Sequence, residues 1–210
     1  MSDLYGNMSD GLVAGNVEEV KKGVQEALDK GVQANEILDK GLLPGMDIVG
    51  QRFKANEMFI PEVIRSANTM HAAMDIIRPL LSETSAAGVG TVVIGTVAGD
   101  LHDIGKNLVG MMLEGAGFKV VDLGTDVKPQ AFVEATKQHN PNILGMSALL
   151  TTTMPKMKET INALREAGIR DQVKVMGGGA VLTQEFFMGI GGDAYASNAA
   201  EAVEKAKSLV

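Results

Sequence analysis

The sequence predicts an α/β protein with an N-terminal helical bundle cap followed by a Rossmann-like (flavodoxin-like) doubly wound five-stranded parallel sheet. Residues 9–81 repeat their apolar side chains at steps of three and four, the period of an amphipathic helix. After residue 90, short apolar β-branched runs alternate with helical stretches, which is typical of parallel βαβ units. The period changes at SETSAAGVG (82–90), where we expect a linker between domains of residues 1–87 and 88–210.

Local start and stop signals predict four or five short helices in the first half. Asn16 can cap a helix that Gly31 can end, and Pro61 suits the first turn of another helix that runs to about residue 81. The helix after Asn16 has an apolar face made by Val17, Val20, Val24 and Leu28. This half is therefore expected to be all-α.

The second half is expected to contain five strands and five helices. The candidate strands are residues 91–97, 119–123, 142–147, 173–176 and 193–196. The helical stretches are residues 105–116, 128–139, 154–167, 183–190 and 199–208. In an open parallel sheet, ligands bind at the carboxyl ends of the strands, near the point where the strand order reverses. We therefore expect the loops after the first, third and fourth strands to converge on one site.

Composition and charge narrow the possible partners. The chain has 210 residues, a net charge of −7 and no cysteine. The acidic balance argues against a nucleic acid or an anionic membrane as partner, because both attract basic patches. No apolar run approaches the roughly 18 residues of a membrane span, and the first residues lack a signal-peptide pattern. We expect a cytoplasmic protein without disulfides or thiolate metal ligands.

The loop after the first strand places a histidine between two aspartates, in GDLHDIGKNL (99–108). A lone histidine is most often a surface or structural residue. Asp100, however, stands two positions before His102, and a metal-bound histidine commonly donates its other ring N–H to a carboxylate. One histidine without cysteines or a second histidine nearby cannot hold a metal ion alone. The pattern favours a metal that arrives in a macrocycle, to which His102 adds one axial nitrogen.

The other two loops each allow two interpretations. Gly177–Gly179 suits close approach of the backbone to a ligand, but it equally suits an ordinary tight turn between a strand and a helix. Ser147, Thr151 and Thr153 offer hydroxyl groups. Such residues most often cap the following helix, and Thr153 shortly before Pro155 fits that role.

Three motifs together resemble those of cobalamin-binding domains. DLHDIG (100–105) matches the DxHxxG signature, SAL (147–149) matches the SxL element, and Gly177-Gly178 matches the closing GG. Their order and spacing agree as well, with 41 residues between the first two motifs (106–146) and 27 between the second and third (150–176). With its all-α half, nearly the whole chain resembles the corrinoid proteins of methyltransferase systems (methylamine, methanol, O-demethylase or betaine type) and the related module of methionine synthase.

The resemblance implies a cobalamin or related corrinoid bound base-off and His-on, with its nucleotide base buried as a tail. His102 would be the metal ligand below cobalt, Asp100 its hydrogen-bond partner, and Thr153 would extend the relay, where methionine synthase has serine. Gly105 would let the loop turn into its helix, and Gly177–Gly179 would leave room for the tail. The implied cofactor-binding residues are Asp100, His102, Asp103, Ile104, Gly105, Ser147, Leu149, Thr151, Thr153, Gly177, Gly178 and Gly179.

The resemblance also implies a carrier that does not turn over alone. Such proteins alternate between cob(I)alamin and methylcob(III)alamin, and they move a methyl group from a substrate-specific methyltransferase to an acceptor methyltransferase that uses tetrahydrofolate or coenzyme M. A reductive activase would be a third partner. A (β/α)₈ methyltransferase barrel of about 250 residues does not fit in this chain.

Three other functions share parts of this pattern. A cobalamin-dependent sensor would add a DNA-binding or signalling domain, whereas neither end of the sequence contains a basic recognition helix. The small subunit of an adenosylcobalamin mutase would carry the same motif, usually without a helical cap. A flavodoxin-like receiver or binding module without a cofactor would be colourless and would not bind hydroxocobalamin.

Overall fold

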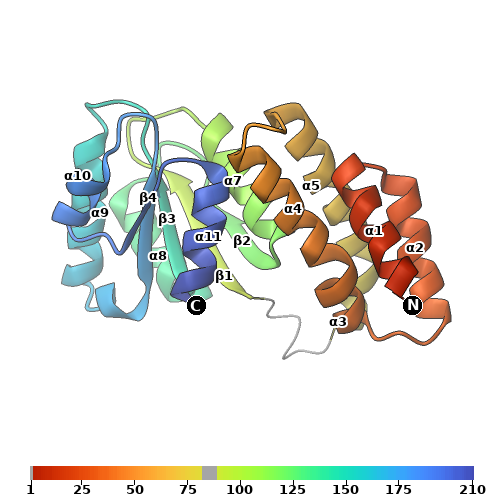
Figure 1. Ribbon diagram of the computed structural model, residues 1–210. Coiled ribbons are helices and arrows are strands. Elements are labelled where there is room, and N and C mark those ends of the chain that lie inside the picture. The colour runs from red at the N-terminus through yellow and green to blue at the C-terminus, as the bar shows by residue number, and fades with distance from the viewer. Residues whose placement is uncertain (1, 82–88) are drawn as a thin grey trace. The chain divides into compact units, whose positions relative to one another are not determined.

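The chain divides into a helical unit and an α/β unit, whose elements are labelled in Figure 1. A computed structural model describes residues 2–81 and 89–210. One unit is Met1–Gly88 with Glu114–Gly117, and the other is Val89–Leu113 with Phe118–Val210. Most of the expected linker, residues 82–88, lies outside the described residues. Within the described ranges, no helix is both long and apolar enough to cross a membrane.

The helical unit consists of short helices joined by tight turns. They are α1 (Ser2–Ala14), α2 (Val17–Asp29), α3 (Ala34–Ile37), the π-helix Leu38–Leu42, α4 (Leu43–Lys54), α5 (Ile60–Ile77) and the 3-10 helix Arg78–Leu80. The first helix begins at Ser2, earlier than the period that we expected to start at residue 9. Gly6 and Gly11 obscure its pattern, although Met8 and Leu12, four residues apart, are both buried.

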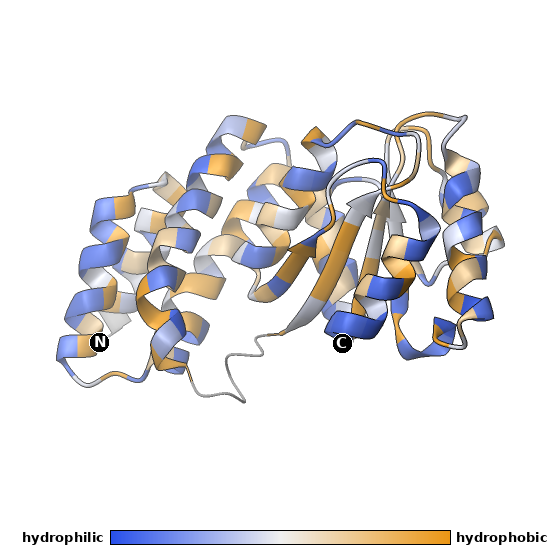
Figure 2. Ribbon diagram, turned by 180° about the vertical axis from the view of Figure 1, so that it is seen from behind, coloured by the Kyte–Doolittle hydropathy of each residue, from blue (hydrophilic) through white to orange (hydrophobic). Residues whose placement is uncertain are grey.

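Helix α2 has the predicted start, face and end. The Asn16 side chain accepts a hydrogen bond from the Glu19 N–H at 3.3 Å and so satisfies one free donor of the first turn. Gly31 has a φ of 79°, which ends the helix at little steric cost because glycine has no Cβ. Val20 and Val24 are fully buried. Figure 2 shows the resulting apolar and polar stripes along the helices.

The α/β unit is built on a five-stranded sheet in which every strand pair is parallel, with the order β2-β1-β3-β4-β5. The strands are β1 (Gly90–Thr96), β2 (Phe118–Asp122), β3 (Ile143–Ser147), β4 (Lys174–Gly178) and β5 (Ala194–Ala196). The helices are α7 (Ile104–Gly115), α8 (Pro129–His139), α9 (Met154–Glu166), the 3-10 helix Arg170–Gln172, α10 (Gln184–Gly189) and α11 (Ala199–Leu209). The predicted fold class is confirmed, with element ends shifted by one or two residues.

Alternate strand residues point to opposite sides of the sheet. On one side, Val93, Leu144 and Val175 share a core with residues of α8, α9 and α10. The other side carries α7 and α11 (Figure 1). The β1–α7–β2 connection lies on this side because it crosses the sheet in the direction opposite to the connections through α8, α9 and α10, and such connections are right-handed. Because the strand order reverses between β1 and β3, the loops that follow these two strands are neighbours at the carboxyl edge.

Candidate functional site

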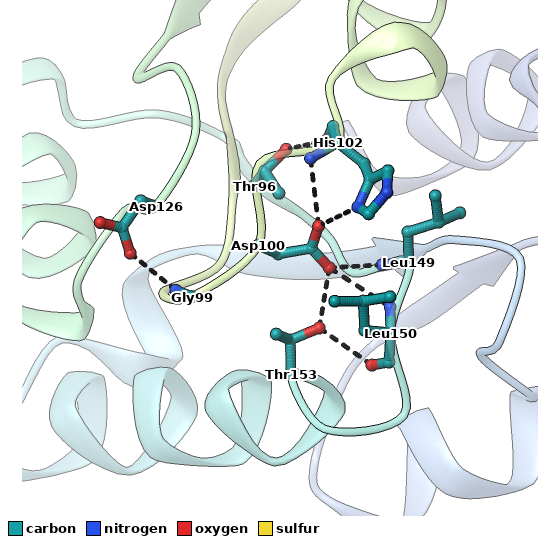
Figure 3. Close-up of polar contacts among 8 residues, drawn as sticks. All are labelled: Thr96, Gly99, Asp100, His102, Asp126, Leu149, Leu150 and Thr153. Atoms are coloured by element: carbon teal, nitrogen blue, oxygen red, sulfur yellow. Dashed lines mark hydrogen bonds and ion pairs between the residues drawn. The ribbon is translucent and has the colours of Figure 1, made fainter.

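A buried carboxylate joins the loops that follow β1 and β3 (Figure 3). Asp100 has no exposed surface, and its Oδ2 accepts hydrogen bonds from the Thr153 hydroxyl and the Leu149 N–H, each at 2.7 Å. The Leu150 N–H adds a longer bond at 3.3 Å. The other oxygen, Oδ1, lies 2.7 Å from the ring Nδ1 of His102 and accepts its backbone N–H at 3.1 Å. One side chain therefore ties two loops to the histidine.

These hydrogen bonds keep Asp100 ionised. Burial alone would raise the pKa of Asp100, but the Leu149 N–H, the His102 ring and the Thr153 hydroxyl together hold that pKa well below its usual range. A charged acceptor favours the His102 tautomer that carries its proton on Nδ1, an assignment that follows from the hydrogen-bond network. The other ring nitrogen, Nε2, then keeps its lone pair and can bind a metal.

The His102 ring lies in an apolar surrounding. Half of its side chain is exposed, at 50%. On either side of it in the loop, Leu101 is 74% exposed and Ile104 is 77% exposed, and Leu150 from the facing loop is 40% exposed. Large apolar side chains are usually covered, so these exposed residues next to the histidine in the two loops indicate a surface that is suited to an apolar ligand.

Two polar residues outside the predicted site, Thr96 and Asp126, hold the histidine loop. The fully buried Thr96, at the end of β1, donates its hydroxyl to the His102 carbonyl at 2.9 Å. Asp126, from the loop after β2, accepts the Gly99 N–H at 2.6 Å and donates its own N–H to the Asp100 carbonyl at 3.0 Å. Gly99 has a φ of 77°, which favours glycine. Thr96 and Asp126 could have been predicted from the sequence, because polar residues just after neighbouring strands meet at the carboxyl edge of the sheet.

Thr153 precedes α9 as expected, but its hydroxyl does not cap that helix. The hydroxyl lies 2.7 Å from Asp100 Oδ2 and 2.9 Å from the Leu150 carbonyl, both of which are acceptors. Since a hydroxyl has one proton, it can donate to only one of them at a time. Thr153 therefore belongs to the Asp100 network rather than to the helix start.

The glycines of the third loop have different surroundings. A Cβ at Gly177 would lie 2.2 Å from a ring carbon of Phe187, and a Cβ at Gly179 would lie 1.9 Å from the Ala148 carbonyl oxygen. Both positions thus require glycine for contacts within the protein. Gly178 lies on the opposite face of β4 from Gly177. A Cβ at Gly178 would lie 2.9 Å from the Ala196 carbonyl oxygen, so backbone is close to this position as well. That the three glycines leave room for a cofactor tail stays a prediction.

Gly178 is part of a row of small residues across the carboxyl end of the sheet. In register, Thr96 pairs with Ser147, Ser147 with Gly178, and Gly178 with Ala196. All four lie on the sheet side that carries α7 and α11. Among the described residues, the Ser147 hydroxyl has no hydrogen-bond partner. The row therefore combines low side-chain volume with a free hydroxyl group.

The remaining residues of the predicted site lie at the start of α7 and in the loop after β3. Asp103 is exposed and accepts the Asn107 side-chain amide at 3.1 Å. Gly105 lies inside α7 with ordinary helical backbone, so the turn into the helix does not require glycine there. A Cβ at Gly105 would meet nothing within 4 Å. Thr151 is exposed, away from the Asp100 hydrogen bonds.

Comparison with known proteins assigns the family. Residues 90–205 match a B12 binding domain family, and residues 5–78 match a second family described as a B12 binding domain. Dimethylamine corrinoid protein 1 of Methanosarcina acetivorans is 45% identical over 203 residues, covering 94% of this chain and 95% of that protein. The chain belongs to the B12-binding corrinoid proteins.

Solved structures with the same fold support the assignment. A cobalamin-binding protein from Desulfitobacterium hafniense is 34% identical with a TM-score of 0.83, covering 98% of each chain. A chain of the methanol:cobalamin methyltransferase complex from Methanosarcina barkeri is 31% identical with a TM-score of 0.88, covering 99% of this chain and 79% of that one. The corrinoid protein thus shares both of its units with these structures.

The residues of the site fit a corrinoid better than a bare metal ion. Among the described residues, no three His, Cys, Asp or Glu side chains gather in a way that could hold a metal. A corrin ring supplies the four equatorial ligands itself, so one free imidazole nitrogen is what the corrinoid protein has to add. The apolar side chains of Leu101 and Ile104 and the open space beside Gly105 suit a flat macrocycle.

Proposed function

We propose that this corrinoid protein carries a methyl group on the cobalt of a base-off, His-on corrinoid. The methyl group comes from a substrate:corrinoid methyltransferase and goes to a second methyltransferase that uses tetrahydrofolate or coenzyme M. The observation that carries the proposal is the 2.7 Å contact between Asp100 Oδ1 and His102 Nδ1, which leaves Nε2 free on a half-exposed ring. When bound, the corrinoid supplies a cobalt ion that can accept and release a methyl group.

The residues of the chain have separate roles in this proposal. His102 Nε2 would be the protein ligand to the cobalt of a bound corrinoid, and Asp100 would orient the ring through Nδ1. The row Thr96, Ser147, Gly178 and Ala196 accommodates the buried nucleotide base, with Ser147 as a hydrogen-bonding group. Thr151 would contact the nucleotide base together with Ser147. The further residues proposed to bind the cofactor are Asp103, Ile104, Gly105, Leu149, Thr153, Gly177 and Gly179. We also propose residues 1–87 as the helical domain and residues 88–210 as the cofactor-binding domain.

The Asp100 carboxylate would hold the proton of His102 at Nδ1 through their 2.7 Å contact, so the ring would present Nε2 to a bound corrinoid. Thr153 can direct its hydroxyl to Asp100 or to the Leu150 carbonyl without moving its backbone. The Leu149 N–H keeps the buried carboxylate hydrogen-bonded in either orientation of that hydroxyl.

The partner enzyme selects the methyl donor. A relative named for dimethylamine and a chain from a methanol:cobalamin methyltransferase complex both align with almost all of this chain. Because that second protein was solved in a methyltransferase complex, it supports a methyltransferase as partner here. A reductive activase that restores the cofactor completes the set of partners, and we place all of them in the cytoplasm.

Reconstitution with hydroxocobalamin tests the proposal. We expect the purified chain to retain one cobalamin after gel filtration, with the absorption spectrum of a histidine-ligated form. His102→Gly should still bind some corrinoid but lose that spectrum and change the rate of methyl transfer with a partner methyltransferase, whereas His139→Gln, in α8 of the same unit, should behave as the wild type. A wild-type chain that stays colourless, or identical spectra for wild type and His102→Gly, would contradict the proposal.

A further inference from the structure

Lys106 is buried in the first turn of α7, directly after the DxHxxG motif. Only 1% of its side chain is exposed. Removing an ammonium group from water is unfavourable unless the group is paired. Its Nζ forms an ion pair with the Asp122 carboxylate at the end of β2 and donates to Asn107 Oδ1 at 2.6 Å. An apolar side chain could fill this position without the cost of removing a charge from water. The buried charge therefore calls for a functional explanation.

One route of contacts leads from Lys106 through α7 to the residue beside His102. Asn107, which accepts from Lys106, donates its side-chain amide to Asp103 Oδ2 at 3.1 Å. The Asn107 backbone N–H also donates to the Asp103 carbonyl at 2.7 Å. Lys106 therefore orients the side chain that holds the loop residue next to the histidine.

A second route leads from Lys106 through the sheet to His102 itself. The other oxygen of Asp122 accepts the Gly124 N–H at 2.8 Å, and the Gly124 carbonyl accepts the Thr96 N–H at 3.0 Å. The Thr96 hydroxyl then donates to the His102 carbonyl at 2.9 Å, as Figure 3 shows. The two routes together form a hydrogen-bond network around the β1–α7 loop, and Lys106 is the side chain common to both routes.

We propose that Lys106, through its Asp122 ion pair and its bond to Asn107, is a positioning residue that holds the backbone of His102 in place for ligation. Asp100 orients the imidazole ring, whereas the hydrogen-bond network around Lys106 restrains the loop from which the imidazole projects. A ligand atom must be held to within about 0.5 Å of its productive position, which a freely moving loop cannot do. The inference rests on the proposed role of His102 as the lower ligand of a corrinoid.

The Lys106→Met variant tests whether Lys106 positions the His102 loop or only stabilises the folded protein. Methionine has a similar length and fills the buried site with an apolar group, while Asp122, 44% exposed, can be solvated. We expect the folded state to be retained. In the cofactor-free protein, amide hydrogen exchange at His102 and Asn107 should rise roughly tenfold, the scale of losing one charge-assisted hydrogen bond. With cobalamin bound, the histidine-ligated fraction should fall at least about threefold on the same scale.

Lys30→Met is the matched control, because it removes the exposed 2.7 Å pair of Lys30 with Glu26 in the helical unit. It should change neither measurement. Asn107→Ala provides a second test that leaves the buried ion pair in place and cuts only the first route, so it should shift both measurements in the same direction by less.

Unchanged exchange and spectra in folded Lys106→Met overturn the inference, and if that variant does not fold, unchanged values in Asn107→Ala do so. A wild-type protein without a histidine-ligated spectrum overturns the proposed function instead. The exchange measurement on the cofactor-free protein stays decisive for Lys106, since it requires no corrinoid.

Discussion

The hydrogen bonds around Asp100 and His102 determine the charge of the carboxylate and the tautomer of the imidazole. The carboxylate is fully buried and accepts hydrogen bonds from both loops, so it can remain charged where an isolated carboxylate would not. That charge sets the histidine tautomer and leaves Nε2 available. The aspartate is therefore as necessary to the proposed ligand as the imidazole.

Gly105 provides a prediction at the level of one residue. It lies in α7, and a Cβ there would meet nothing within 4 Å, so nothing in the described structure requires glycine. We expect Gly105→Ala to raise the free energy of unfolding by up to about 1 kcal/mol, because glycine is a poor helix residue. The affinity for corrinoid should nevertheless fall roughly tenfold or more, since the alanine side chain would occupy space proposed for the cofactor.

Chemical denaturation and cobalamin titration measure these two effects on Gly105→Ala. Gly189→Ala is the matched control, because Gly189 also lies in a helix with nothing within 4 Å of its Cβ position. It should gain stability without a change in affinity. Equal affinities for the two variants would remove Gly105 from the proposed site.

At the level of elements, the glycines after β4 position α10. Gly177 on β4 and Gly192 before β5 both lie against the Phe187 ring of α10, and a Cβ at either position would come within 2.2 Å of a carbon of that ring. Phe187 is fully buried in the core with α8 and α9. A motif glycine is therefore needed here to pack a helix against the sheet.

Gly177→Ala tests this packing. The added methyl group collides with the Phe187 ring, and overpacking of this kind costs about 1–3 kcal/mol of unfolding free energy. The double variant Gly177→Ala/Phe187→Leu should recover part of the loss relative to the sum of the single variants, as a urea-unfolding double-mutant cycle would show. Additive effects of the two substitutions would mean that the contact does not limit stability.

At the level of the whole molecule, the buried charge of Asp100 predicts how stability depends on pH. Its pKa in the folded protein lies below the ordinary value of 3.8. A depressed pKa contributes stability that is fully present above about pH 4 and is lost as the pH falls through and below that value. The chain has 26 acidic residues, so the contribution of Asp100 has to be measured as a difference between proteins.

Asp100→Asn isolates that contribution. We expect the variant to be less stable than the wild type at pH 7 and the gap to narrow as the pH falls from about 4 toward 2, measured by urea unfolding at each pH. Asp171→Asn, which changes an exposed carboxylate, should follow the wild type throughout. A gap that stays constant over this range would show that the charge of Asp100 does not stabilise the fold.

Local sequence signals determined most of the architecture. Both halves of the chain were predicted from local features, which act over a few neighbouring residues. These features are the period of the apolar side chains, the helix ends at Asn16 and Gly31, and the alternation of strands with helices. The first helix was placed too late, since its glycines weaken the local signal. The pairing of Asp100 with His102 was also predictable, because two residues of one turn are close whatever the rest of the chain does.

Only the tertiary structure decided which distant groups complete the site. Asp126, from the loop after β2, accepts the Gly99 N–H, and Asp122, at the end of β2, pairs with Lys106, although both aspartates are far from the loop after β1 in the sequence. The same holds for the glycines: the structure puts Phe187 against Gly177 and open space beside Gly105, a difference that identical residue types cannot reveal. The sequence alone predicted the proposed ligand His102 and its carboxylate partner Asp100 because the two residues are neighbours in one loop. The fold decided which groups restrain that loop, because packing and hydrogen bonding act through space.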